Sequence, residues 1–227
     1  MRSCLLSSTY FGPVQWYQKL NRYDVCLIEQ HDSFIKQTFR NRCVIATTNG
    51  TQTLSIPIEH ASQDQPLHSA QKMRDIGISD HGNWRHLHWY ALQSAYGESP
   101  FFDYYIDDLR PFFEQKWEYL LDFNMAITEK MCKLLDIRPN IRLTAAYGKP
   151  ISDDSCEDGL RRRDDDSCMA PQLSDFREAI RPKHPIPDDE FNPTPYYQVY
   201  QQKHGFLPNL SILDLLFNEG NESILYL

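Results

Sequence analysis

The chain has 227 residues, of which 23 are Lys or Arg and 31 are Asp or Glu, so its formal net charge is −8. Hydrophobic residues make up 41% and aromatic residues 13% of the sequence, which excludes a disordered chain, because such chains are poor in aromatic and β-branched residues. The acidic balance argues against a nucleic-acid binder, since contacts to phosphates require a basic face.

The amino-terminal segment predicts a parallel βαβ unit. A short apolar run at 4–8 is followed by Pro13, which suits the first turn of a helix over residues 14–20. Residues 24–29 then have the apolar pattern of a buried strand. Because a strand, a helix and a strand follow one another so closely, we expect the two strands to pair in parallel.

A β-hairpin is predicted next. Residues 39–46 and 51–58 are rich in β-forming side chains, and Asn49-Gly50 between them is a strong turn signal. Apolar residues alternate over 73–78, which favours a further short strand.

Helices dominate the prediction after the hairpin, because apolar residues recur there at intervals of three and four. They are expected over residues 84–96, 101–113 and 122–135, and again after Pro208. A last strand is expected over 141–147. Ser211 or Asn209 could cap the final helix, and Gly220 would end it.

The predicted organisation is a single domain of the α/β class. Residues 1–149 form its core, a small mixed sheet with the N-terminal parallel βαβ unit, the hairpin as an extension, and flanking helices. Residues 150–195 hold 12 of the 31 acidic residues and are rich in proline, so we expect a loop or excursion there. Residues 196–227 form a C-terminal helical segment, apolar enough to pack back on the core.

A cytoplasmic location with reduced thiols is expected. The first ten residues hold only two leucines where a signal peptide needs about 7–15 apolar residues, and no run approaches the roughly 18 of a membrane span. The six cysteines form no CxxC pair. Cys4, Cys26 and Cys43 lie in apolar runs and are expected in the core. Cys156 and Cys168 lie in a polar stretch.

The sequence lacks the catalytic motifs that are recognised by fixed spacing. It has no P-loop, GxGxxG, GxSxG or HExxH pattern, which disfavours Walker-type nucleotide use, ordinary NAD use and α/β-hydrolase chemistry. No metal site is predicted, because His86 and His88 are two residues apart on a helix and point to different faces. No tightly bound cofactor is expected.

Four residues are individual candidates for chemistry. Glu29 ends a buried strand, where carboxylates often face a ligand crevice, although a simple strand-end charge is the alternative. His88 lies on the apolar stripe of its helix, so it is either a hydrogen-bonded core histidine or a general base facing a pocket. Tyr10 and Trp84 are either core aromatics or sugar-stacking faces.

A cluster of cationic and amide side chains follows the βαβ unit, at Lys36, Arg40, Asn41 and Arg42. Three cations and an amide so close together could hold a phosphate, a pyrophosphate or a carboxylate. The alternative is a surface cluster that serves solubility.

Three blocks of residues span nearly the whole chain. The first is Tyr10-Phe11-Gly12-Pro13 with Tyr17, Lys19, Asp24-Val25, Phe34-Ile35-Lys36 and Asn41-Arg42; the second is Trp84, His88, Tyr96 and Ser99-Pro100-Phe101-Phe102; the third is Pro208-Asn209-Leu210-Ser211-Ile212-Leu213-Asp214-Leu215-Leu216-Phe217-Asn218. In these blocks the chain resembles the WbqC-like family of bacterial proteins.

The resemblance implies a place in gene clusters for O-antigen or other surface polysaccharides. The implied activity is transfer of an amino acid or acyl group, glycine in particular, to an amino sugar. The family-type residues are Tyr10, Pro13, Lys36, Asn41, Arg42, His88, Asp214 and Asn218. Many members have His-Gln-Pro where this chain has Ser7-Ser8-Thr9, so a catalytic histidine at that position would need a replacement here.

The resulting hypothesis is a transferase that acylates or aminoacylates a nucleotide-linked amino sugar. His88 or Glu29 would be the base that takes the ammonium proton, and Asn41 and Arg42 would hold the oxyanion or the diphosphate. An activated acyl or aminoacyl donor would be the cosubstrate. The expected substrate-binding residues are Tyr10, Lys36, Asn41, Arg42, Trp84, Asp214 and Asn218.

The alternative hypothesis is a non-catalytic binding or scaffold protein of the same pathway, with a protein partner. An enzyme is expected to gather four side chains in one deep pocket, namely Tyr10, Glu29, Arg42 and His88. A scaffold is expected to expose a broad apolar patch instead. Neither hypothesis involves nucleic acid or a membrane span.

Overall fold

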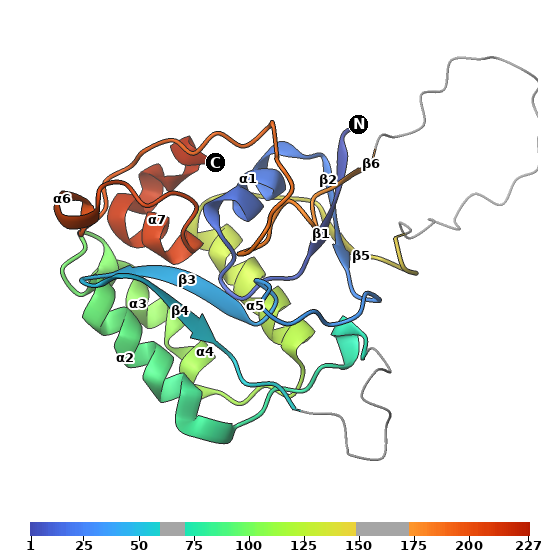
Figure 1. Ribbon diagram of the computed structural model, residues 1–227, viewed down its shortest axis with the longest axis horizontal. Coiled ribbons are helices and arrows are strands. Elements are labelled where there is room, and N and C mark those ends of the chain that lie inside the picture. Colours follow the sequence, from blue (N-terminus) through green and yellow to red (C-terminus); the bar gives the residue numbers. More distant parts are fainter. Residues whose placement is uncertain (60–70, 149–172) are drawn as a thin grey trace, which may run out of the picture.

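The computed structural model describes residues 1–59, 71–148 and 173–227 (Figure 1). Within these ranges the chain forms seven α-helices, a four-stranded parallel sheet and a separate two-stranded antiparallel sheet, which confirms the predicted α/β class. Cys156 and Cys168 lie outside the described residues. None of the helices in the described ranges is both long and apolar enough to cross a membrane.

The parallel sheet is built around the predicted βαβ unit. Strand β1 (Ser3–Ser7) pairs in parallel with β2 (Val25–Glu29), and helix α1 (Val14–Arg22) connects them. The central residues of both strands are buried without alternation, as is typical of parallel strands covered on both faces. Strand β5 (Ile141–Leu143) pairs with β2, and β6 (Leu173–Asp175) pairs with β1, in the order β5-β2-β1-β6.

Strand β6 differs from the prediction, which placed residues 173–175 in a loop or excursion. Its three residues have no apolar pattern, and all three pair with β1 from Ser3 to Leu5. The amide of Phe176 continues the pairing with the carbonyl oxygen of Leu5 at 3.0 Å. Backbone pairing with a distant strand therefore places this segment in the sheet.

The hairpin is confirmed but does not extend the parallel sheet. Strands β3 (Arg42–Thr47) and β4 (Gly50–Ser55) pair in antiparallel register and form a sheet of their own. In Figure 1 the hairpin lies at the centre of the molecule, with α2, α3 and α4 on one side of it and the parallel sheet on the other. The hairpin thus separates a helical layer from the α/β unit.

Residues 73–78 are not the predicted strand. Met73–Asp75 form a 3₁₀ turn, η1, and the next residues make only isolated bridges: Gly77 with Tyr119, and Ile78 with Ile58. Met73, Ile76 and Ile78, the apolar residues on which the prediction rested, are nevertheless buried.

The helices after the hairpin lie close to the ranges that the apolar periodicity predicted. The predicted helix over 101–113 is split before Pro111, which begins a new helical turn. The helices after the hairpin are α2 (Trp84–Tyr96), preceded by the 3₁₀ turn η2 (His81–Asn83), then α3 (Phe102–Leu109), α4 (Pro111–Glu114), α5 (Leu120–Leu134) and α6 (Gln201–His204).

The last helix, α7 (Ile212–Glu219), is almost entirely buried. Its N-cap Ser211 accepts a hydrogen bond from the amide of Leu213, and the amide of Ser211 donates to the carbonyl oxygen of Val44 in β3. Gly220 ends the helix at a positive φ of 56°, and a β-carbon there would lie only 2.7 Å from the ring of Phe101. The 3₁₀ helix η3 (Gly220–Tyr226) follows.

Candidate functional site

Polar side chains gather at the edge where the parallel strands end. Strand β2 ends at Glu29, β5 is followed by Thr144, and β6 ends at Asp175. Because the strands are parallel, these ends meet at one edge of the sheet. Ligands of open α/β sheets bind outside this edge.

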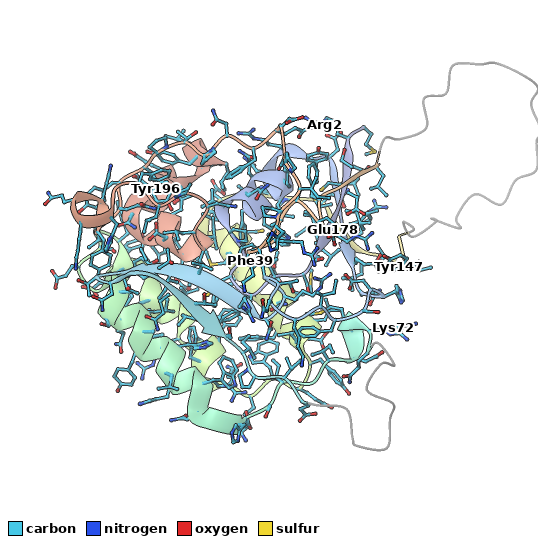
Figure 2. The ribbon with its side chains drawn as sticks, viewed as in Figure 1. Arg2, Phe39, Lys72, Tyr147, Glu178 and Tyr196 are labelled. Carbon is cyan, nitrogen blue, oxygen red and sulfur yellow. The ribbon has the colours of Figure 1, made fainter. Side chains whose placement is uncertain are left out.

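A cavity of about 370 Å³ opens there, and we call it the sheet-edge cavity. Its size lies within the roughly 300–1,000 Å³ range of small-molecule sites. Figure 2 labels Tyr147 and Glu178, which lie on its wall from the segments after β5 and β6. The lining is mainly polar: His31, Asp32, Ser33, Ile35, Arg40, Tyr147, Asp175, Arg177 and Glu178.

Glu29 supports this cavity from beneath. Its Oε1 accepts hydrogen bonds from the amide of His31 (2.7 Å) and the hydroxyl of Thr144 (2.9 Å), and its Oε2 accepts one from the amide of Gly148 (2.7 Å). The carboxylate is fully buried, and Nη1 of Arg177 lies 3.9 Å from Oε2. Both oxygens are occupied by the chain itself, so Glu29 positions the segments that line the cavity.

Asp32 and Arg40 form a buried ion pair on the cavity wall. A guanidinium nitrogen of Arg40 donates to Oδ2 of Asp32, and both side chains are at least nine-tenths buried. Asp32 Oδ1 and Arg40 Nε have no hydrogen-bond partner among the described residues. Burial raises the pKa of Asp32 more than the neighbouring Arg40 lowers it. Both unpaired atoms are themselves buried, so the pair belongs to the wall of the cavity.

Arg177 is held rigidly on the same wall. Its Nε and Nη2 donate to the two carboxylate oxygens of Asp175 at 3.0 and 2.7 Å, and its guanidinium carbon lies 5.1 Å from the centre of the Tyr147 ring. The hydrogen bond to Asp175 raises the pKa of Arg177. A bidentate pair of this kind fixes the guanidinium plane, so the cavity contains a preorganised cation.

The structure brings Lys36, Asn41 and Arg42 together in a second cavity of about 350 Å³, which we call the hairpin cavity. Phe34 and Lys36 line this cavity, whereas Ser33 and Ile35 line the sheet-edge cavity, so neighbouring residues of one segment serve both. The hairpin cavity combines two cations and an amide, a set that suits a phosphate or a carboxylate.

Tyr10, Trp84 and His88 belong to a packed aromatic cluster. The hydroxyl of Tyr10 lies 2.9 Å from Nδ1 of His88, the ring of Trp84 is 5.2 Å from that of His88, and the indole of Trp84 donates to the carbonyl oxygen of Ser79. Burial lowers the pKa of His88 to about 4. All three side chains are buried, and they line neither of the two cavities.

Asp214 and Asn218 lie together on the buried helix α7. Hydroxyl groups of Tyr96 and Tyr196 donate to the two carboxylate oxygens of Asp214 at 2.9 and 2.7 Å, and the Gln198 amide adds a third hydrogen bond at 2.9 Å. Asn218 donates to the backbone carbonyl of Asp214. Burial raises the pKa of Asp214 to about 6. These contacts hold α7 between α2 and the segment 196–198.

The four side chains expected to meet in one pocket lie in three places. Glu29 is beneath the sheet-edge cavity, Arg42 lines the hairpin cavity, and Tyr10 and His88 share the aromatic cluster. Of the predicted cluster of cations and an amide, Arg40 alone lines the sheet-edge cavity, and the other charged residues there, such as Asp32 and Arg177, were not predicted as site residues. Asp32 could have been predicted, because it lies shortly after the end of β2. The argument that selected Glu29, a carboxylate at the end of a buried strand, applies to Asp32 as well.

Comparison with known protein families matches residues 8–226 of the chain to the WbqC-like protein family. The chain is also similar to the uncharacterized protein Rv1507c of Mycobacterium tuberculosis (strain ATCC 25618 / H37Rv). The two are 26% identical over 234 residues, which cover 98% of this chain and 96% of that protein. No solved structure matches the chain.

Proposed function

The chain belongs to the WbqC-like protein family, and from this premise we propose that it is a transferase of surface-polysaccharide assembly. It passes an acyl or aminoacyl group of the glycine type to the amine of an amino sugar. The observation that carries the proposal is the sheet-edge cavity, because Asp32, Arg40 and Arg177 line it together. A carboxylate and two guanidinium groups are the groups that such a transfer uses.

Acyl transfer to an amine needs a proton acceptor and an oxyanion donor. The sugar nitrogen bonds to the acyl carbon, the bond from that carbon to the leaving group breaks, and the nitrogen loses a proton. Asp32, the carboxylate that lines the cavity beside the two arginines, would take this proton. Its raised pKa improves it as a base near neutral pH. The guanidinium groups of Arg40 and Arg177, which line the cavity, would donate to the developing oxyanion.

Glu29 and His88 fit this role less well than Asp32. The two oxygens of Glu29 already accept three hydrogen bonds from the chain, so Glu29 is a positioning residue in the proposal. His88 lies in the aromatic cluster, where burial lowers its pKa to about 4. A base with so low a pKa at a distance from the cavity is a poor acceptor for the substrate proton.

The donor in this proposal arrives already activated, as a thioester or an adenylate. Burial raises the pKa of the Cys43 thiol and raises that of Cys132 to about 12, so neither provides a thiolate at neutral pH. The acceptor sugar would be nucleotide-linked. Its diphosphate would lie in the hairpin cavity, on Lys36 and Arg42.

We predict that Asp32→Asn lowers kcat for acyl transfer by roughly 10²–10⁴-fold, because the proton acceptor is lost. The assay supplies acyl-coenzyme A thioesters or aminoacyl adenylates with uridine diphosphate amino sugars, and mass spectrometry detects the amide product. Substrate binding, measured by thermal shift, is expected to persist in this variant, since the arginines remain. Circular dichroism checks that each variant is folded.

The control is Arg138→Ala, which removes an exposed arginine before β5, at the opposite edge of the sheet. It is expected to leave the rate unchanged. A folded wild-type protein that neither binds nor acylates any amino sugar of the panel contradicts the transferase proposal. That outcome favours the alternative, a non-catalytic binding or scaffold protein of the same pathway.

A further inference from the structure

Strand β4 is an edge strand, because it pairs with β3 on one side only. The alternation of antiparallel pairing decides which of its backbone groups face β3. The amide of Ile56 donates to the carbonyl oxygen of Asn41 at 2.8 Å, so this pair is hydrogen-bonded, and so is every second pair along the hairpin. The N–H and C=O groups of Thr51 and Thr53 belong to the pairs between, and they therefore point away from β3.

The outer edge of β3 confirms this alternation. Val44 and Ala46 lie opposite the two threonines in the register, so their backbone groups must point away from β4. The carbonyl oxygen of Val44 accepts a hydrogen bond from the N-cap amide of α7, and the amide of Ala46 donates to the hydroxyl of Tyr96 in α2. The outer edge of β3 is thus occupied by two helices of the same chain.

The outer edge of β4 is occupied only at its C-terminal end. The ring of His88 lies against the backbone of Ser55, and the chain beyond Ser55 pairs with residues 77–79. No hydrogen bond within the described part of the chain reaches the backbone groups of Thr51 and Thr53 on this side. Both residues are exposed, so two N–H and two C=O groups are free at one edge.

This free edge lacks the features that keep strand edges from pairing with another chain. Lysine, proline and bulges are the usual protection of an exposed edge. Residues 51–53 are Thr, Gln and Thr, which are neutral, and the register of the hairpin runs from Arg42 to Thr47 without a bulge. The whole chain carries a net charge of −8, so an uncharged edge is a place where a second copy meets little repulsion.

We propose that the edge of β4 pairs with the same edge of a second copy of this chain, in antiparallel register about a twofold axis at Gln52. Thr51 of one copy then lies opposite Thr53 of the other, and the two residues exchange both backbone hydrogen bonds. The symmetry repeats this pair, so all four free groups of each copy are used. The exposed Gln52 side chains lie opposite each other, and each amide can donate to the other. The two hairpins become one four-stranded sheet.

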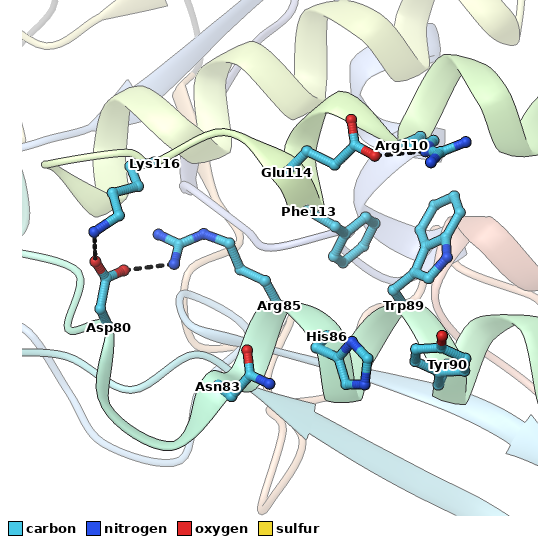
Figure 3. A pocket seen from close by; sticks show the side chains of 10 residues that line it. All are labelled: Asp80, Asn83, Arg85, His86, Trp89, Tyr90, Arg110, Phe113, Glu114 and Lys116. Carbon is cyan, nitrogen blue, oxygen red and sulfur yellow. Dashed lines mark hydrogen bonds and ion pairs between the residues drawn. The ribbon is translucent and has the colours of Figure 1, made fainter.

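The edge is separate from the cavities of the molecule. Residues 51–53 line neither the sheet-edge cavity nor the hairpin cavity. They are also absent from a third cavity, of about 540 Å³ between α2 and α4, in which Figure 3 shows Arg85 turned toward Asp80 and Arg110 turned toward Glu114. The pairing of two copies is therefore independent of the proposed transferase chemistry.

The test is amide hydrogen exchange of the full chain, resolved by residue with NMR, at micromolar and at millimolar protein concentration. Exchange at Thr51 and Thr53 should slow as the concentration rises, in proportion to the fraction of paired chains. The amides of Gln52 and Leu54 point to β3, so they should be equally protected at both concentrations and are the internal control. Translational diffusion in the same samples should show the dimer. Exchange at the two threonines that does not depend on concentration overturns the proposal.

Thr53→Pro removes an N–H group that β3 does not use, so the hairpin keeps its own hydrogen bonds while the edge loses a donor. This variant should stay monomeric at both concentrations. Thr53→Val keeps the backbone N–H and a β-branched side chain, and it should dimerise as the wild type does. Dimerisation that persists in folded Thr53→Pro would place the contact on another surface and overturn the proposal.

The twofold register is tested at Gln52, which is exposed and opposite itself in the dimer. Gln52→Lys and Gln52→Glu each place like charges opposite each other, so each should weaken self-association by up to roughly fivefold. An equimolar mixture of the two variants should restore it, because opposite charges then face each other. Equal self-association of both variants and the wild type overturns the register, and a wild type that is monomeric at millimolar concentration overturns the second copy as the partner.

Discussion

At the scale of single residues, two buried titratable groups have pKa values shifted in opposite directions. Burial lowers the pKa of His88 to about 4, because the charged imidazolium is disfavoured in the aromatic cluster. Burial raises the pKa of Asp214 to about 6, despite the hydrogen bonds from Tyr96 and Tyr196 that favour its charged form. Each difference from the ordinary pKa corresponds to roughly 3 kcal/mol of stability.

We predict that the effects of these two groups on the free energy of unfolding cancel each other between about pH 4 and pH 6.5. The folded protein binds the Asp214 proton more tightly than the unfolded chain does, so this contribution to stability is lost as the pH rises toward 6. The unfolded chain binds the His88 proton more tightly, so that contribution is lost as the pH falls toward 4. Urea unfolding at a series of pH values measures both.

The variants His88→Gln and Asp214→Asn separate the two contributions. As the pH falls from 6.5 to 4, the free energy of unfolding of His88→Gln should rise by about 3 kcal/mol relative to that of the wild type. As the pH rises from 4 to 6.5, the free energy of unfolding of Asp214→Asn should rise by a similar amount relative to that of the wild type. His86→Gln, which removes an exposed histidine from the same helix, is the control. A constant difference from wild type at every pH would show that neither group titrates as argued.

At the scale of elements, the apolar pattern of the sequence predicted where α1 and the β3–β4 hairpin lie in the chain. The expected helix over 14–20 and the expected hairpin correspond to α1 and to β3 and β4, because their side chains carry the pattern that buries them. Strand β6 has no such pattern and depends on backbone pairing with β1. Because β1 lies more than 160 residues before β6, the local sequence of β6 does not indicate that the two strands pair.

The same distinction applies to the candidate site. Glu29 was predicted to lie at the sheet edge from the end of its strand, and the structure places it beneath the cavity there. Arg177 reaches the same cavity only because β6 joins the sheet, so its place could not be predicted without that strand. Asp214 has the spacing of a capping acid, yet its carboxylate binds two tyrosines of other elements instead.

The segment after β6 is tied to α1 by a buried ion pair. Lys19 Nζ lies 2.8 Å from Asp188 Oδ2 and 4.2 Å from the centre of the Phe176 ring, and Lys19 is fully buried. The Gln15 side chain donates to the same carboxylate at 2.8 Å. A buried pair of this kind is costly to break on one side only, because the remaining charge has no partner.

We predict that Lys19→Met lowers the free energy of unfolding by about 3–5 kcal/mol, because Asp188 stays buried without its cation. Adding Asp188→Asn should recover most of this loss, since the amide oxygen still accepts from Gln15. Lys133→Met, which removes an exposed pair with Glu129, should cost less than about 1 kcal/mol. Chemical denaturation measures all four proteins, and a double variant no more stable than Lys19→Met contradicts the argument.

At the scale of the whole molecule, α7 joins the α/β unit to the helical layer. It contacts α1, α3 and β3, and the side chains of Ile212, Leu213, Leu215, Leu216 and Phe217 are fully buried. The backbone at its start is hydrogen-bonded to Gly12 on one side and to Val44 on the other. A helix placed in this way is part of the common core, and we expect the described segments to unfold as one cooperative unit.

We predict that Leu216→Ala lowers stability by about 2–5 kcal/mol, because it leaves a cavity at the centre of this core. If the core is a single unit, hydrogen exchange should accelerate by the same factor in peptides from β1, from α2 and from α7, since all of them open together. Leu225→Ala, which truncates a side chain that is 76% exposed, should leave all three peptides unchanged. Loss of protection confined to residues 196–227 would instead make the C-terminal segment a separate folding unit, and the single-domain expectation would then be wrong.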